Sequence, residues 1–223
     1  MNKTNYQSAE RIQQGLLACW ERTALAWLAA RVPARINSDH LTLLGFGAML
    51  AAGVFYFLSA RQPWMLHLVN LSLVANWFGD SLDGTLARYR KMQRPRYGFY
   101  VDHITDAVGT MFLLTGLAFS GFMNERVAFA LLVLFLLLSI NSYLWAHAMG
   151  RFQLSFWKFS PTELRVLLII GNFYLLHSPM VGLLGYRVRL FDAGGIIGAC
   201  LMALMLLIST ARHTRQLYRL ERV

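Results

Sequence analysis

The chain has 223 residues, of which 57% are hydrophobic and 14% are charged. An ordinary soluble domain has roughly 45–50% hydrophobic and about 25% charged residues, so this composition argues against a soluble protein. The formal net charge of +10 would suit a nucleic-acid-binding protein. No basic and aromatic platform lies outside the apolar segments, however, so we expect no nucleic-acid partner.

The first predicted element is an amphipathic helix of about residues 5–35. Apolar side chains, including Trp20 and Trp27, repeat there at helical spacing, whereas Glu21 and Arg22 fall largely on other sides of the helix. This pattern predicts a helix that lies in the cytoplasmic membrane interface. The alternative is a cap helix of the soluble type. A signal peptide fits poorly because Glu21 and Arg22 interrupt the apolar run.

Six apolar segments without Asp, Glu, Lys or Arg follow along the chain, at residues 41–60, 62–79, 107–124, 127–150, 166–186 and 193–211. Each has close to the roughly 20 residues that a helix needs to cross about 30 Å of hydrocarbon, whereas barrel strands would need about ten residues of alternating polarity. The sequence therefore predicts an all-α integral membrane protein with six transmembrane helices in a single domain, residues 1–223. The predicted spans are about 41–60, 62–79, 98–124, 127–150, 163–186 and 191–211.

The basic residues indicate how these spans are oriented. With six spans, the two termini and the second and fourth loops carry 17 of the 21 Lys and Arg residues. The positive-inside rule places these regions in the cytoplasm. We therefore expect a multi-pass protein, typical of a bacterial inner membrane, with both termini cytoplasmic. Gly194 and Gly198 have the spacing of a helix-packing surface that would suit a homodimer.

Four of the eleven acidic residues lie close together in the sequence, namely Asp80, Asp83, Asp102 and Asp106. An ionisable side chain costs roughly 2.5–3.5 kcal/mol at mid-bilayer, so a cluster at the ends of two spans indicates function. Offsets of three and four place each pair on one helix face, and a short antiparallel connection would bring the faces together. All-oxygen ligands suit Mg²⁺, Mn²⁺ or Ca²⁺. Two divalent ions would balance the four charges and could clamp a transferring phosphoryl group.

The residues after the first pair favour a ligand that approaches the helix backbone. Gly84 and Ala87 lie about one turn apart and leave a surface without large side chains. Arg88 follows on the same side and offers forked donors to phosphate oxygens. The sequence therefore predicts a phosphoryl-transfer site where the second span ends and the third begins.

The segment from Asp80 to Asp106 resembles the signature of the CDP-alcohol phosphotransferases. That signature reads Asp, two residues, Asp-Gly, two residues, Ala-Arg, eight or nine residues, Gly, three residues, Asp, three residues, Asp, and all eight positions are present. The resemblance implies a phospholipid-biosynthetic enzyme. It would transfer a substituted phosphate group from a CDP-alcohol, expected to be CDP-diacylglycerol, to an acceptor hydroxyl with release of CMP at the cytoplasmic leaflet.

The resemblance also implies a role for each signature residue. Asp106 would take the proton of the acceptor hydroxyl, and Gly98 would allow close helix approach. Many members have a Pro-Asn-x-x-Thr segment before the first span, of which this chain keeps Thr42 but has Ser38 and Asp39 in place of Pro and Asn. The implied ligands of two Mg²⁺ or Mn²⁺ ions are Asp80, Asp83, Asp102 and Asp106, and the implied nucleotide-binding residues are Gly84, Ala87, Arg88 and Gly98.

Three further residues are candidates for binding the acceptor. Residues 160–163 read Ser-Pro-Thr-Glu, which predicts a helix start with a capping box. A Pro-Thr-Glu at this place also occurs in some branches of the family, including aminoalcohol transferases, so Glu163 would contact the acceptor. Arg151 and Arg165 fit the positive-inside rule and would also suit the phosphate of a phosphorylated acceptor.

Three alternatives stay open. A CDP-aminoalcohol transferase would act on a diacylglycerol-type lipid acceptor. An intramembrane Mg²⁺-dependent prenyltransferase also uses two Asp-rich clusters, although these normally lie far apart on a larger bundle. A cation transporter would place its acids near the middle of its spans. The acceptor stays open among serine, glycerol phosphate, inositol phosphate, choline and diacylglycerol.

Overall fold

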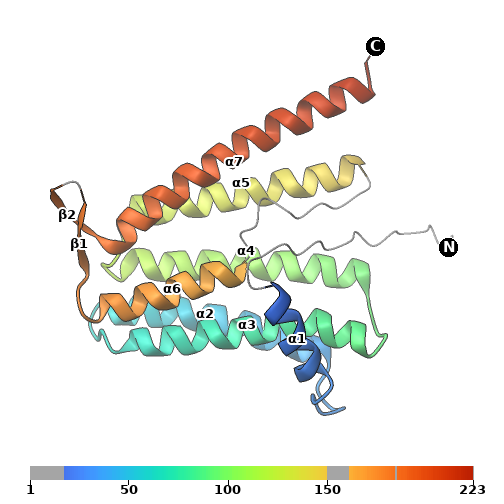
Figure 1. Cartoon of the computed structure of the whole chain (residues 1–223), viewed down its shortest axis with the longest axis horizontal. Helices are drawn as coiled ribbons and strands as arrows, with labels where there is room; N and C mark the ends of the chain where they lie inside the picture. The colour runs from blue at the N-terminus through green and yellow to red at the C-terminus, as the bar shows by residue number, and fades with distance from the viewer. Residues whose placement is uncertain (1–17, 150–160, 184, 223) are drawn as a thin grey trace.

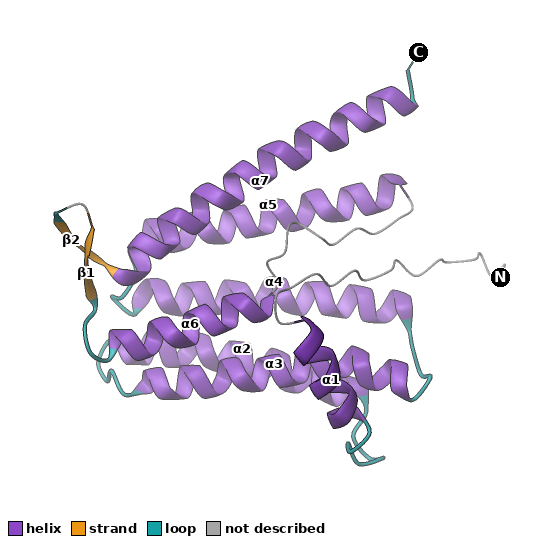
Figure 2. Cartoon of the chain, in the orientation of Figure 1, coloured by secondary structure: helices purple, strands orange, loops and turns teal. Residues whose placement is uncertain are grey.

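A computed structural model describes residues 18–149, 161–183 and 185–222, which form seven helices and one antiparallel β-hairpin. The helices are α1 (Ala18–Ala29), α2 (Ser38–Ser59), α3 (Met65–Tyr89), α4 (Pro95–Phe119), α5 (Glu125–Met149), α6 (Pro161–Leu175) and α7 (Leu190–Leu220), and the strands are β1 (Met180–Leu183) and β2 (Tyr186–Arg189). The long helices lie side by side, α1 crosses α3 near one end of the bundle, and the hairpin lies at the other (Figure 1, Figure 2). The prediction of a mostly helical protein is confirmed.

The helices differ in whether their length and hydropathy suit a membrane crossing. Among the described residues, α2, α5 and α7 are long and apolar enough to cross one. They expose large apolar side chains such as Phe57, Leu144 and Leu207, as expected of helices in lipid. Helices α3 and α4 have 25 residues each, or about 37 Å, but carry the charged signature at their joined ends.

The predicted span 163–186 is wrong. Helix α6 has 15 residues, which is about 22 Å and shorter than the hydrocarbon layer. The chain leaves the helix after Leu175, and Pro179 follows, a residue that cannot continue a helix. Gly185 then adopts a φ of +85° at the hairpin turn, a conformation that favours glycine. An uncharged sequence of sufficient length is therefore divided between a short helix and a hairpin.

Helix α2 packs closely on both α3 and α4 because glycines let the helix backbones approach one another. A Cβ added to Gly79 of α3 would lie 2.5 Å from the backbone oxygen of Leu41. A Cβ added to Gly116 of α4 would overlap the backbone oxygen of Gly53. Small residues at such crossings bring helix backbones into contact. Helices α3 and α4 pack mainly on α2 and much less on each other.

Replacing Gly116 by alanine is expected to lower thermal stability. The added methyl group would collide with the backbone of Gly53, which cannot move aside as a flexible side chain can. Overpacking costs about 1–3 kcal/mol, so we expect the unfolding midpoint in detergent to fall by about 2–10 °C. The matched control is Gly47→Ala on α2, where a Cβ would meet nothing within 4 Å. Equal midpoints for the two variants would contradict this account of the α2–α4 contact.

A buried polar chain fixes α6 against α2 and α3. The hydroxyl of Tyr56 donates to Asn172 Oδ1 at 2.8 Å, and Asn172 Nδ2 donates to Asn70 Oδ1 at 2.8 Å. Tyr56 and Asn172 are both fully buried. Hydrogen bonds between helices are favoured in an apolar bundle because lipid offers the same groups no partner. The short helix α6 is thereby held in one position relative to α3.

Helix α7 packs on α5 through a glycine next to the predicted pair. A Cβ on Gly195 would lie 2.6 Å from Val127 Cγ1, and one on Gly198 would lie 3.6 Å from Leu131 Cδ2. A Cβ on Gly194 would meet nothing within 4 Å. Gly195, and not Gly194, therefore makes the close contact with α5. The homodimer stays a prediction.

Candidate active site

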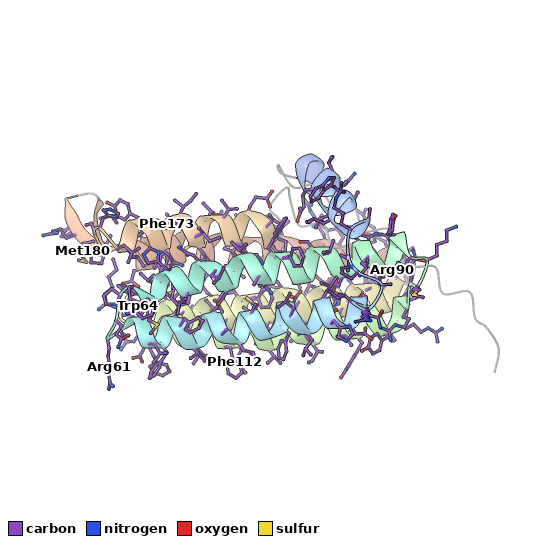
Figure 3. All side chains as sticks on the ribbon, turned by 90° about the horizontal axis from the view of Figure 1, so that it is seen from below. Arg61, Trp64, Arg90, Phe112, Phe173 and Met180 are labelled. Carbon is purple, nitrogen blue, oxygen red and sulfur yellow. The ribbon has the colours of Figure 1, made fainter. Side chains whose placement is uncertain are left out.

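Figure 3 shows Arg90 at one end of the bundle and Arg61, Trp64 and Met180 at the other. Asp80 and Asp83 lie in the half of α3 that ends next to Arg90, and Asp102 and Asp106 lie in the first half of α4. Helix α3 ends at Tyr89, and α4 begins with Pro95 at its first position, where the fixed φ of proline suits a helix. The two helices therefore run antiparallel along α2. Their four carboxylates meet at one cavity, so the predicted convergence of the two pairs is confirmed.

The cavity is small and almost entirely made of α2, α3 and α4. It is lined by Thr42, Gly45, Phe46, Met49, Asn76, Asp80, Asp83, Asp102, Thr105 and Asp106. Its volume is about 10 Å³, which is room for about one water molecule. Within the described part of the chain, no three acidic, His or Cys side chains are yet placed to hold one metal ion.

Asp83 is the most enclosed of the four carboxylates, with 8% of its surface exposed. Thr42 Oγ1 donates to Asp83 Oδ2 at 2.5 Å, across the α2–α3 contact. Burial raises the pKa of Asp83, which lies beyond the apolar segment 62–79, to about 7. The hydrogen bond from Thr42 opposes this rise, and the negative charges of Asp102 and Asp80 add to it. The cluster of four aspartates therefore lacks enough positive charge to balance it, and a bound cation would supply that charge.

Asp80 forms an ion pair with Arg165 of α6, with 2.6 Å between Arg165 Nη2 and Asp80 Oδ2. The Arg165 side chain is only 11% exposed. The structure thus brings a predicted acceptor-binding residue against a predicted metal ligand. Glu163 is buried near the start of the described part of α6, which begins at Pro161, and the expected cap residue Ser160 lies outside the described residues. Arg151 lies outside the described residues.

The predicted nucleotide-binding residues lie on the open side of the site. Gly84 and Ala87 are half-buried on α3, and exposed Arg88 donates to Thr85 Oγ1 at 3.1 Å. A Cβ on Gly98 of α4 would meet nothing within 4 Å. Among the described residues, no neighbouring helix reaches Gly98, so the close helix approach expected there is not observed. The open surrounding of Gly98 leaves space for a ligand.

Ser38 and Asp39, which stand in place of the Pro and Asn of the family pattern, both make contacts at the site. Ser38 Oγ donates to the backbone oxygen of Asp83 at 3.0 Å, and Asp39 forms an ion pair with Arg94, just before α4. Together with the hydrogen bond from Thr42 to Asp83, these contacts connect the start of α2 both to α3 and to the residue just before α4, the two helices that carry the signature. Of these three residues, only Thr42 could be singled out from the sequence, because it alone matches the family pattern.

Glu21 connects α1 to α3 and α6, which the helical pattern of the sequence did not predict. It is 9% exposed and accepts hydrogen bonds from Trp77 Nε1 at 2.9 Å, Ser81 Oγ at 3.1 Å and Thr162 Oγ1 at 3.0 Å. The expectation that Glu21 lies away from the buried face is wrong, because its three donors come from α3 and α6. Trp27 on the same helix is 56% exposed. Residues 5–17 of the predicted helix 5–35 lie outside the described residues, and its predicted end is wrong, because α1 ends at Ala29 and residues 30–35 form turns.

Asn76 is the second residue that the sequence did not reveal. It lies one turn before Asp80, lines the same cavity and is 4% exposed. Its Nδ2 donates to the backbone oxygen of Gly45 at 2.9 Å, and its Oδ1 is buried without a hydrogen-bond partner. Nearby His103 instead has Nδ1 2.5 Å from the backbone oxygen of Phe99. The donor set is thus oxygen only, which fits Mg²⁺ or Mn²⁺.

A family model described as CDP-alcohol phosphatidyltransferase matches residues 36–211, which include every element of this cavity. The chain belongs to the CDP-alcohol phosphatidyltransferase family. It is therefore a membrane transferase of phospholipid biosynthesis that uses a CDP-alcohol donor and an alcohol acceptor. The prenyltransferase and transporter alternatives are excluded. Members of this family generally depend on divalent metal ions.

A solved structure has a similar fold. It is the crystal structure of Mycobacterium tuberculosis phosphatidylinositol phosphate synthase (PgsA1) with CDP-DAG bound, at a TM-score of 0.56 and 18% sequence identity. The similarity covers 88% of this chain and 92% of that chain. Among curated proteins, no sequence match is found. At this identity the similarity concerns the fold, and the family assignment comes from the matched sequence.

Proposed function

We propose that this CDP-alcohol phosphatidyltransferase transfers the phosphatidyl group of CDP-diacylglycerol to an acceptor hydroxyl and releases CMP. The observation that carries this proposal is the single cavity at which all four signature aspartates converge. In the reaction, a bond forms between the acceptor oxygen and the phosphorus distal to cytidine. The bond from that phosphorus to CMP breaks, and the hydroxyl proton passes to a base.

Asp106 is the proposed base. It is the exposed member of the carboxylate cluster, whereas Asp83 is enclosed, so an acceptor hydroxyl can reach it. An unperturbed Asp has a pKa of about 3.9 and is a weak base at pH 7. Holding the hydroxyl beside Asp106 in the attacking geometry must therefore supply much of the rate enhancement.

The remaining signature residues position the donor. Gly84, Ala87 and Gly98 leave room for the nucleotide to approach α3 and α4, and Arg88 offers forked donors to the phosphate oxygens of the leaving CMP. The proposed ligands of two Mg²⁺ or Mn²⁺ ions are Asp80, Asp83, Asp102 and Asp106. When bound, these ions would stabilise negative charge on the phosphate oxygens and acidify the hydroxyl.

Arg165 favours an acceptor that carries a phosphate group. Its guanidinium is nearly buried, and its partner Asp80 is a proposed cation ligand. Once a cation neutralises Asp80, the guanidinium needs another anion, because an unpaired charge in such a place is costly. An alcohol phosphate such as glycerol phosphate or inositol phosphate would supply it. A CDP-aminoalcohol transferase is the alternative, since the buried carboxyl group of Glu163 lies on α6 close to Arg165 in the sequence.

We place the active site at the cytoplasmic leaflet. The loop between α3 and α4 carries Arg90 and Arg94 at the same end as the carboxylates, and the positive-inside rule favours the cytoplasm for such a loop. The full proposal of six membrane crossings with both termini cytoplasmic, as in a bacterial inner membrane, requires α6 and the hairpin to make one crossing together.

Purified protein in lipid nanodiscs, supplied with CDP-diacylglycerol and Mn²⁺, is expected to release CMP when a phosphorylated alcohol is added. We expect release at least about tenfold faster with glycerol phosphate or inositol phosphate than with serine, because losing a charge partner costs more than about 1.4 kcal/mol. CMP release from CDP-choline with diacylglycerol would instead support the aminoalcohol alternative. No CMP from any CDP-alcohol and acceptor, with folded protein, would contradict the proposed activity.

A further inference from the structure

Asn76 extends the row of signature carboxylates one turn deeper into the bundle. It precedes Asp80 by four residues and Asp83 by seven, so the three side chains lie on one face of α3. All three line the cavity between α2, α3 and α4. The apolar residues Phe46 and Met49 of α2 line it as well. Asn76 is therefore the most buried polar side chain that lines this cavity, whereas Asp106 is exposed.

The hydrogen bonds determine which end of the amide is available. The backbone oxygen of Gly45 can only accept, so the group 2.9 Å from it must be Nδ2, the donor end of Asn76. This leaves Oδ1 as the free end. Oδ1 is fully buried and accepts no hydrogen bond from any described residue. Leaving such an atom unsatisfied destabilises the fold, so a native structure that keeps one usually satisfies it with a ligand or water.

A divalent cation is the ligand that best fits this oxygen. Carbonyl oxygens of Asn side chains are ordinary ligands of hard divalent ions, either directly or through a bound water. Four carboxylates already balance two divalent ions, so a fifth carboxylate would leave surplus negative charge in a buried place. An amide adds an oxygen ligand without adding charge. The neighbouring position Gly79 keeps the backbone of Asn76 and Asp80 against α2.

We propose that the side-chain carbonyl of Asn76 is a buried, uncharged oxygen ligand of the divalent-cation site and strengthens cation binding there. The inference rests on the proposed function, because that function requires cations at the four aspartates. It assigns to Asn76 a task outside the eight signature positions. It also accounts for an amide with one end bonded to α2 and the other end unsatisfied.

The test measures Mn²⁺ binding to purified protein without substrate, from the signal of free Mn²⁺ in electron paramagnetic resonance. Asn76→Leu keeps the approximate volume but removes the oxygen, and its Mn²⁺ Kd is expected to rise about tenfold. Asn76→Asp restores an oxygen but also loses the bond to Gly45, and its affinity is expected to stay within about threefold of the original or to increase. Ser72→Ala, one turn earlier on α3, buried and not lining the cavity, is the matched control.

The unfolding midpoint of each metal-free variant is recorded alongside. A purely structural role for Asn76 predicts that both Asn76 variants lose stability equally and keep the Mn²⁺ affinity of the original protein. That result would overturn the inference and leave the proposed function intact. Failure of the original protein itself to bind Mn²⁺, even with CDP-diacylglycerol present, would overturn the cation site and the inference together. Weaker binding by Asn76→Leu alone would support the inference.

Discussion

Replacing Asp106 by asparagine is expected to reduce CMP release by about 10²–10⁴-fold, the usual contribution of a general base. The asparagine side chain would occupy the same volume at the exposed edge of the cavity but could not accept the proton of the acceptor hydroxyl. The rate is measured as CMP formed from CDP-diacylglycerol at saturating Mn²⁺ and acceptor. The loss should fall mainly on kcat, because the missing interaction is made in the transition state.

Asp192→Asn is the matched control for this substitution. Asp192 lies near the hairpin end of α7, where its Oδ1 accepts a hydrogen bond from the backbone N–H of Asn124 at 2.5 Å. An asparagine oxygen can accept the same bond, so we expect a rate within about twofold of the original. If Asp106→Asn retained the rate of this control, Asp106 could not be the base.

Replacing Asp83 by asparagine, or removing divalent cations with EDTA, is expected to reduce CMP release by about 100-fold or more. Loss of one charged ligand forfeits several kcal/mol of charge stabilisation, and each 1.36 kcal/mol corresponds to about a factor of ten. Asparagine keeps an oxygen that can accept the hydrogen bond from Thr42, so the α2–α3 contact is preserved. Added Mn²⁺ should restore the EDTA-treated protein and should not restore the variant.

The stability of the Asp83 variant provides an independent measurement. Burial and neighbouring charges disfavour the ionised form of Asp83 in the metal-free protein, so a neutral asparagine removes that cost. The metal-free unfolding midpoint of Asp83→Asn should equal or exceed that of the original protein, whereas Mn²⁺ should stabilise only the original. A variant that still gains stability from Mn²⁺ and releases CMP at the original rate would show that Asp83 is no cation ligand.

Some features of this site depend on short sequence spacing and could be predicted without a structure. The offsets within Asp80–Asp83 and within Asp102–Asp106 fix each pair on one helix face, because a helix repeats every 3.6 residues. The chain connection between the pairs is short, so their convergence followed as well. The helix packing behind this convergence differs from the expected direct contact between the two faces. Helices α3 and α4 both pack on α2, since glycines such as Gly79 let the backbones approach it.

Other expectations failed where local sequence permits more than one outcome. The predicted span 163–186, whose residues 166–186 carry no Asp, Glu, Lys or Arg, is long enough to cross a membrane, but length and composition do not reveal that the helix ends at Leu175. Glu21 interrupts an apolar pattern and so was assigned to its polar side. Its burial depends on donors from Trp77, Ser81 and Thr162, which are more than 50 residues away along the chain.

The sequence by itself therefore determined that the protein is a helical membrane enzyme, which residues form its signature and which family it resembles. These properties depend on composition and on spacing within a few helical turns. The tertiary structure alone decided which side chains support that signature: Thr42 on Asp83, Arg165 on Asp80, and Asn76 with its unsatisfied carbonyl oxygen. Helical periodicity specifies the face on which a residue lies. The partner on that face is set by how separate helices pack, which no local pattern encodes.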